Sequence, residues 1–265
     1  MQSKFRKAAK VLITFLLFAS IAPFVSATPP QPAIFQIKIY QFKTADQESA
    51  IDKYLENALL PLLHRSGITE VGVFKPIAND TAAIKKIYLF IPFKNLDDFG
   101  RLPGLLAGDS KYRNDAKDWV EAPYNNPPYL RIESIVLKAF PGMTGYEKPQ
   151  LKGSSGERIY ELRSYEGPTE EKFENKVRMF NDGDEIGLFK RLGFNAVFYA
   201  SVISGAHMPN LMYMTSFDNM VSHDQHWKAF VDDPQWKKLI SMPEYQNNVS
   251  HIDIVLLHPT PYSDL

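Results

Sequence analysis

Hydrophobic side chains recur with two different periods along the chain. In residues 34–42 they occupy alternate positions, which is typical of a β-strand with one buried face. In residues 51–63 they recur at intervals of three and four, which predicts an amphipathic helix. Pro61 lies inside this helical pattern and predicts a kink or an early end, because its ring clashes with the preceding turn. Gly67 then predicts the cap that ends the helix.

The same order of patterns occurs in both halves of the chain. In the first half, further strands are expected near residues 71–74, 87–91 and 132–137, and a second helix after Asn95. In the second half, strands are expected near residues 159, 196–202, 211–215 and 252–257, and helices from about Thr169 and from Asp218. Each half therefore has the order β-α-β-β-α-β, which is that of a ferredoxin-like unit.

Four pairs of short segments resemble each other at nearly constant spacing, which indicates an internal repeat. The pairs, at offsets of 125, 126, 125 and 124 residues, are Phe35–Tyr40 with Tyr160–Tyr165, Leu63–Gly67 with Phe189–Gly193, Ile87–Leu89 with Met212–Met214, and Asp109–Tyr112 with Asp233–Trp236. At the last of these offsets, Asp233 is expected to cap a short helix that begins at Pro234.

The repeat predicts the fold class, an α+β protein. A ferredoxin-like unit covers one face of its sheet with helices and leaves the other face bare, so two units are expected to pack sheet to sheet as an α+β barrel. The pattern leaves open whether the barrel closes within one chain or between two chains of a homo-oligomer. The expected divisions are a signal peptide (1–27), a first unit (28–140), a linker (141–157) and a second unit (158–265).

The first 27 residues have the composition of a secretory signal peptide. Four basic residues precede a short hydrophobic run at residues 11–18, and Val25-Ser26-Ala27 is a small-residue cleavage signature. The run is shorter than the roughly 20 residues that span a bilayer. Cleavage near Ala27 and a periplasmic or secreted destination are therefore expected, with no membrane span in the mature chain.

Composition narrows the classes of function. The sequence has no cysteine, so disulfides, thiolate metal sites and attachment of a lipid to cysteine are excluded. Four of the 30 basic residues and none of the 30 acidic residues lie in the signal segment, so the mature chain would carry a net charge of −4. A nucleic-acid partner is not expected, because there is no basic stripe to follow phosphates.

Three motifs of the second half resemble the NIPSNAP family: the strand Tyr160–Tyr165, the turn Arg191–Phe194 and the segment Phe230–Trp236. The first half departs from the pattern, with Ser110 in place of Pro234 and Tyr112 in place of Trp236. The resemblance implies a dimeric α+β barrel fold. It supplies no set of catalytic residues.

One face of the helix expected from Asp218 carries two imidazoles and two aromatic rings: His223, His226, Trp227 and Phe230. The first half has only hydrophobic side chains, Phe99, Leu102 and Leu106, where His223, His226 and Phe230 stand. Three interpretations are open. The histidines are solvated or locally capped, or one of them is a general acid or base in a pocket, or the pair belongs to a metal or haem site, for which more ligands would be needed.

The strand motif supplies a second set of candidates. Glu161, Arg163 and Tyr165 share one face of the strand, and Lys38 and Tyr40 echo the last two in the first half. If that face lines the barrel, these side chains are suited to an anionic or phenolic ligand. The alternative is a pair of opposite charges on a sheet surface, with no ligand.

Together these patterns predict a protein that binds a small organic molecule in an α+β barrel pocket, without a metal or cofactor. In this hypothesis His223 or His226 moves a proton, while Glu161, Arg163, Tyr165, Trp227 and Tyr40 contact the ligand. The alternatives are a non-catalytic binding or assembly module and, third, a haem-binding protein. Function is expected in residues 158–258, with residues 34–140 closing the barrel.

Overall fold

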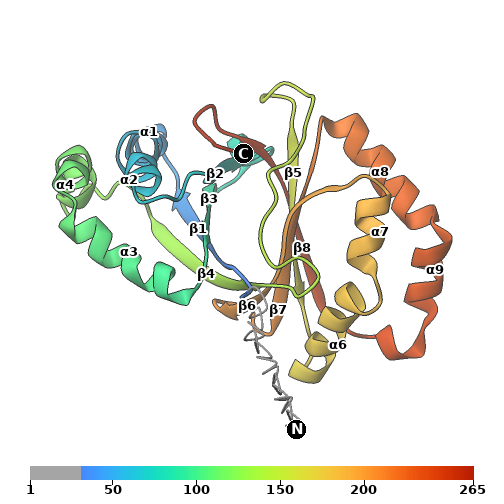
Figure 1. Cartoon of the computed structure of the whole chain (residues 1–265). Helices are drawn as coiled ribbons and strands as arrows, with labels where there is room; N and C mark the ends of the chain where they lie inside the picture. The colour runs from blue at the N-terminus through green and yellow to red at the C-terminus, as the bar shows by residue number, and fades with distance from the viewer. Residues whose placement is uncertain (1–30) are drawn as a thin grey trace, which may run out of the picture. The chain divides into compact units, whose positions relative to one another are not determined.

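A computed structural model describes residues 31–265 of the chain (Figure 1). The predicted signal peptide, residues 1–27, lies outside the described residues and stays a prediction. Within residues 31–265, no helix combines the length and the hydrophobicity that crossing a membrane requires.

The described residues contain eight strands that form a closed barrel in the order β1-β3-β2-β8-β5-β7-β6-β4. Their bounds are β1 Ile34–Phe42, β2 Gly72–Pro76, β3 Lys85–Phe93, β4 Arg131–Ala139, β5 Ile159–Glu166, β6 Asn195–Ser204, β7 Asn210–Phe217 and β8 His251–Pro259. We call β1 to β4 with their helices the first unit, and β5 to β8 with theirs the second unit. Each unit contributes a ferredoxin-like sheet, and the junctions β2–β8 and β4–β6 close the barrel within one chain.

Helices cover the outside of the barrel on two sides (Figure 1). The first unit has α1 Ala45–Tyr54, the π-helical segment η1 Leu55–Leu59, α2 Leu60–Arg65, the 3₁₀ turn η2 Asn79–Thr81, α3 Leu96–Gly108, α4 Ser110–Asp115 and α5 Lys117–Val120. The second unit has α6 Glu170–Asn181, α7 Glu185–Arg191, α8 Met220–Asp232, α9 Pro234–Ser241 and the 3₁₀ turn η3 Pro243–Tyr245. The α+β barrel of ferredoxin-like units predicted from the sequence is confirmed.

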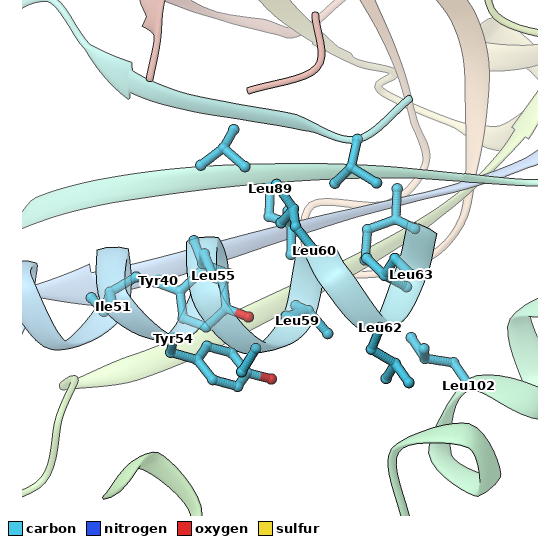
Figure 2. Close-up of a cluster of buried hydrophobic side chains, with 14 of the residues drawn as sticks. Tyr40, Ile51, Tyr54, Leu55, Leu59, Leu60, Leu62, Leu63, Leu89 and Leu102 are labelled. Carbon is cyan, nitrogen blue, oxygen red and sulfur yellow. The ribbon is translucent and has the colours of Figure 1, made fainter. Parts of the chain in front are cut away.

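Strand alternation divides the hydrophobic side chains into three cores. One core fills the inside of the barrel, with Ile37 of β1 and Leu162 of β5 among its members. A second lies between the sheet and the helices of the first unit and is mainly aliphatic (Figure 2). The third lies between the sheet and the helices of the second unit and is mainly aromatic. Each unit therefore has its own core outside the shared barrel interior.

Pro61 does not end its helix. Because proline cannot donate a hydrogen bond, the backbone widens into η1 just before it, where the N–H of Leu60 donates to the carbonyl of Leu55, five residues back. The helix then continues to Arg65. Gly67 follows with φ of 85°, and Gly193 occupies the same place in the second unit with φ of 79°. Both glycines form the expected left-handed caps.

Strand register corrects one of the four repeat pairs. Lys38 lies opposite Leu89, and Arg163 lies opposite Tyr213, so Tyr213 is the counterpart of Leu89 at an offset of 124. The sequence pairing of Tyr88 with Tyr213 was wrong by one residue. Since a slip of one residue reverses the face of a strand, Tyr88 points into the barrel, whereas Tyr213 points toward the helices.

The segment between β4 and β5, predicted as a linker or a long excursion, contains no helix or strand yet is fixed to both units. Thr144 accepts a hydrogen bond from the backbone of Ala33, and the backbone of Glu147 donates to Val197. Farther along, the carboxylate of Asp218 accepts hydrogen bonds from the backbone of Lys152 at 2.6 Å and of Gly153 at 2.9 Å. The segment therefore packs along the barrel.

Candidate functional site

The side chain of Glu161 is a carboxylate buried between β5 and α8. It is 1% exposed and lies on the same face of β5 as Arg163 and Tyr165. The neighbouring positions Tyr160 and Leu162 belong to the barrel core. The strand motif therefore faces the helices, and the hypothesis that this face lines the barrel interior was wrong.

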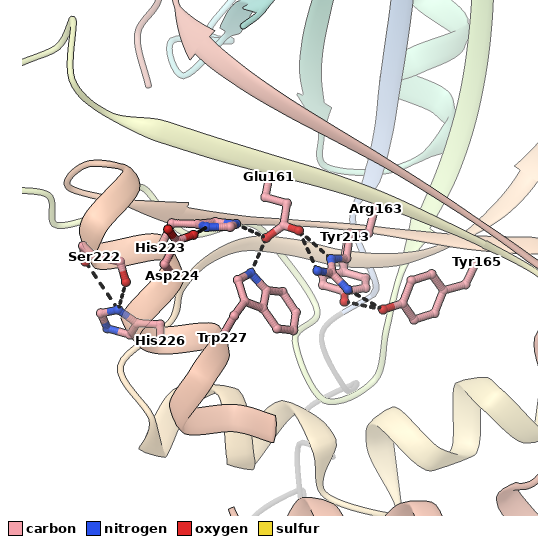
Figure 3. Close-up of polar contacts among 9 residues, drawn as sticks. All are labelled: Glu161, Arg163, Tyr165, Tyr213, Ser222, His223, Asp224, His226 and Trp227. Atoms are coloured by element: carbon pink, nitrogen blue, oxygen red, sulfur yellow. Dashed lines mark hydrogen bonds and ion pairs between the residues drawn. The ribbon is translucent and has the colours of Figure 1, made fainter. Parts of the chain in front are cut away.

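Three side chains donate hydrogen bonds to Glu161 (Figure 3). Arg163 Nε lies 2.7 Å from Oε1, His223 Nε2 lies 3.2 Å from Oε2, and the indole N–H of Trp227 also donates to Oε2. The guanidinium carbon of Arg163 stacks 3.7 Å from the centre of the Trp227 ring. These contacts compensate the buried charge and join α8 to the sheet.

The network continues along the strand and out to solvent. Arg163 donates to the Tyr165 hydroxyl at 3.1 Å, which lies 2.9 Å from the hydroxyl of Tyr213. In the other direction, His223 Nδ1 lies 2.8 Å from the exposed carboxylate of Asp224. His223 thus bridges a buried and an exposed carboxylate.

These contacts set the protonation states. Burial alone would raise the pKa of the Glu161 carboxyl, but the hydrogen bonds from His223, Arg163 and Trp227 outweigh burial and lower it. Burial alone would lower the pKa of His223, but its bonds to Glu161 and Asp224 outweigh burial and raise it. The arrangement favours an ionised Glu161 beside a histidine that carries a proton.

The structure separates the remaining candidates from this network. His226 is on the same helix, but its Nδ1 donates to the carbonyl of Ser222 at 2.6 Å, so the two histidines share no polar partner (Figure 3). Tyr40 is fully buried in the core of the first unit, where its hydroxyl has no hydrogen-bond partner among the described residues and burial raises its pKa. The structure connects five of the site residues predicted from the sequence in one hydrogen-bond network: Glu161, Arg163, Tyr165, His223 and Trp227.

A cavity of about 670 Å³ lies in the first unit, where no sequence pattern indicated a site. Its wall combines hydrophobic side chains, including Ile68, Phe93 and Leu105, with the cations Arg65, Lys94 and Arg101 and the single carboxylate of Asp98. These residues come from the end of α2 and the turn after it, from the end of β3 and the residue that follows it, and from α3, so no spacing in the sequence marks them as one group.

The second unit leaves less open space at the equivalent place, a cavity of about 300 Å³ lined by Gly193 and Phe194 among others. A Cβ atom added to Gly67, which lines the cavity, would have no neighbour within 4 Å, whereas one added to Gly193 would lie 3.3 Å from Nε2 of His226. The next residue is Ile68 in the first unit and Phe194 in the second, and the Phe194 ring packs 5.6 Å from the His226 ring. His226 and Phe194 therefore take up part of the space that the first unit leaves open, and the cavity that remains is smaller.

Comparisons with solved structures show the same fold. A candidate monooxygenase from Fusobacterium nucleatum aligns over 86% of this chain and 93% of its own, with a TM-score of 0.57 and 9% identity. A second candidate monooxygenase, from Lactobacillus acidophilus, aligns over 86% and 94%, with a TM-score of 0.53 and 17% identity. An anthrone oxidase-like protein aligns over 86% and 92%, with a TM-score of 0.50 and 11% identity.

Fold and sequence together place the molecule among α+β barrel proteins. Residues 160–264, most of the second unit, match the sequence model of the NIPSNAP family, so the resemblance of the second unit to that family is confirmed. No curated protein gives a significant match to the chain.

Proposed function

We propose that the protein binds a small organic anion in the cavity of the first unit. The observation that carries this proposal is the combination of size and lining. A volume of about 670 Å³ is in the range that holds metabolites and similar ligands. Three cations against one carboxylate in the wall favour a negatively charged ligand.

The lining also restricts the chemistry of the ligand. Arg65 and Arg101 each lie 3.0 Å from a carboxylate, Asp109 and Asp98 respectively, and both remain accessible to solvent. Lys94 adds a third cation at the end of β3. The hydrophobic wall requires an apolar body of comparable extent. An aromatic or aliphatic carboxylate meets both requirements.

The proposal moves the ligand from the second unit, where the sequence hypothesis had it, to the first. It retains a small organic molecule as the partner of an α+β barrel. The second unit would then support the barrel, with its network around Glu161 joining helix and sheet.

Binding can be tested on the purified chain. Native mass spectrometry would detect a co-purified anion, and thermal shifts with benzoate, indole-3-acetate and octanoate would be compared with those of the matching amides. We expect the acids alone to stabilise. Lys94→Gln and Arg101→Gln should each weaken binding by about tenfold, the usual value of a charged hydrogen bond. Lys237→Gln, on exposed α9, is the matched control and should change nothing.

Steric filling gives a sharper test. Ile68→Phe copies the residue that the second unit has at this place and should abolish binding while the protein remains folded. Equal responses to acids and amides, or unchanged binding by Ile68→Phe, would reject the proposal.

A second function, proton transfer at His223, is favoured by one observation. His223 is 11% exposed and lies between buried Glu161 and solvent-facing Asp224, so a proton on it can pass to a molecule at the surface. Above the pH at which His223 loses this proton, its neutral imidazole can instead take a proton from carbon. Anthrone, a carbon acid whose carbanion dissolved O₂ then oxidises, is a suitable probe, since one structural neighbour is described as anthrone oxidase-like. If the function is real, the protein should speed anthrone oxidation and His223→Phe should not. A rate equal to that of buffer excludes it.

We further propose that the chain is exported. Support comes from the basic, hydrophobic and small-residue segments of residues 1–27. Expression in a bacterial host should yield a periplasmic or secreted protein that begins at Thr28, as N-terminal sequencing would show. An uncleaved cytoplasmic product would contradict export.

A further inference from the structure

Polar side chains gather at one end of the barrel interior, far along β5 from Glu161. Asn210, Glu166 and His251 lie in one row across β7, β5 and β8, since Glu166 is opposite both of the others. In the next row, Asp253 lies opposite Ser164. These positions continue the inward-facing alternation of Leu162, so all of them face the mouth of the barrel.

Nitrogen and oxygen atoms of the kind that bind metals converge here. One ligand atom from each of Glu166, His251 and Asp253 lies within 4.8 Å of the other two. His251 Nε2 is 3.2 Å from Asp253 Oδ1, and Nδ1 of His207, from the turn between β6 and β7, is 3.0 Å from Glu166 Oε1. Two ligands of one tetrahedral ion lie about 3.4 Å apart, so only small side-chain movements separate this arrangement from coordination.

Two buried oxygen atoms provide an independent indication. The Asn210 side chain is 3% exposed, and its Nδ2 donates to Ser164 at 2.8 Å, but its Oδ1 has no hydrogen-bond partner among the described residues. Oε1 of Glu166 also lacks one, because His207 is near it without the geometry of a hydrogen bond. Buried acceptors without donors are costly unless something else compensates them.

Asn210, His207 and Asp253 line the same small cavity, of about 190 Å³, at the barrel mouth. Asp253 belongs both to the wall of this cavity and to the three-ligand group, so a cation bound beside it could satisfy the free oxygens. Glu166 is 21% exposed in its side chain, whereas those of His251 and Asp253 are 58% and 60% exposed, so an ion could enter from solvent.

We propose that this end of the barrel binds a divalent transition metal ion. Glu166, His251 and Asp253 are its ligands, and His207 and Asn210 complete or orient them. The mixture of imidazole and carboxylate suits Zn²⁺ and similar ions, whereas Mg²⁺ and Ca²⁺ take oxygen ligands almost alone.

The site is separate from the proposed anion cavity. The anion cavity meets β3 at Pro92 and Phe93, while the cavity at the barrel mouth meets the same strand at Lys86 and Tyr88. Variants of one site should leave the other unaffected, so the two proposals can fail independently.

Calorimetry with ZnCl₂ on the whole chain, purified without a histidine tag and stripped with a chelator, tests the site. We expect one equivalent to bind and the melting temperature to rise. His251→Ala and Asp253→Asn should each weaken binding at least about tenfold and remove the thermal shift. Both side chains are exposed, so these variants should fold, which circular dichroism would verify.

The matched control is His64→Ala. His64 also pairs with a carboxylate at the surface, Asp264, at 2.8 Å, but it belongs to no three-ligand group among the described residues. This variant should bind Zn²⁺ like the parent chain. Absence of binding, or equal loss in the His64 and His251 variants, would overturn the proposal, and Mg²⁺ binding equal to Zn²⁺ binding would overturn its choice of metal.

Discussion

The two units of the barrel share a backbone plan but fill it with different chemistry. The first unit packs mainly aliphatic side chains between sheet and helices and contains the cavity of about 670 Å³. The second packs mainly aromatic rings there and buries a carboxylate that three side chains satisfy. The comparison shows that the frame of a ferredoxin-like unit does not depend on one kind of core.

What the units have in common lies at helix ends. Asn95 caps α3 and Asn219 caps α8, in each case by accepting a hydrogen bond from the backbone three residues on. The guanidinium of Arg65 lies 3.0 Å from Asp109, and that of Arg191 lies 3.0 Å from Asp233. Both units therefore share these helix caps and these arginine–aspartate pairs, which we call clamps. The side chains between the sheet and the helices differ from one unit to the other.

The largest expected effect is in the second unit. Glu161→Gln installs the residue that the first unit has at this place, Gln36, and leaves the charge of Arg163 without its partner in a mostly buried position. We expect unfolding free energy to fall by about 3 kcal/mol, as for other broken buried pairs. Urea unfolding would measure it. Gln36→Ala is the control in the first unit and should cost less; a loss below that of the control would show that the network adds no stability.

Exchange of the residues after the two capping glycines should have unequal effects on stability in the two units. Phe194→Ile removes ring contacts with Phe189 and Trp227 and should cost about 2 kcal/mol. Ile68→Phe enters an open cavity and should change stability by less than about 1 kcal/mol. Thermal unfolding of both variants compares them directly. Equal losses would mean that the first-unit cavity cannot accept a ring.

Removal of the two clamps should have small and equal effects. Asp109→Ala and Asp233→Ala each delete the N-cap of a short helix and the partner of an arginine. Both melting temperatures should fall by less than that of Phe194→Ile. Unequal losses would show that the units use these contacts differently. Asp80→Ala, at an exposed turn, is the control.

The smallest effect is a pH dependence confined to the second unit. Since the folded pKa of His223 is raised, its protonated form stabilises the fold fully below the unfolded value near 6.5, and this contribution is lost as pH rises through the folded value. The parent chain should therefore lose stability relative to His223→Phe as pH rises above 6.5. Unfolding curves at several pH values measure the difference. A constant difference would mean that His223 is not charged in the fold.

The periodicity of hydrophobic residues was enough to predict the order and position of the main strands and helices. The first strand was expected at residues 34–42 and lies at Ile34–Phe42, and the α3 and α8 helices correspond at the offset of 124. The effect of Pro61 on its helix was harder to predict, because a proline in a helical pattern does not distinguish a helix that breaks from one that widens into a π-helical turn.

The sites were less accessible to sequence reasoning. Glu161, Arg163 and His223 were identified as candidates, but their face depended on strand pairing that alternation alone does not give. The cavity of the first unit is larger than its counterpart because Ile68 is smaller than Phe194 and because no atom lies close to the Cβ position of Gly67, which are facts of packing between distant segments. The row of Asn210, Glu166 and His251 depends on pairing across three strands.

Closure of the barrel by one chain has a consequence for how its halves can change. In a barrel made by two identical chains, every substitution appears twice, so opening one core also opens the other. Here the strands β2 and β8, and β4 and β6, join two halves encoded separately. A mutation can therefore enlarge a cavity in one half while the packing of the other half stays unchanged. Covalent linkage releases the molecule from twofold symmetry and permits division of labour within a single polypeptide.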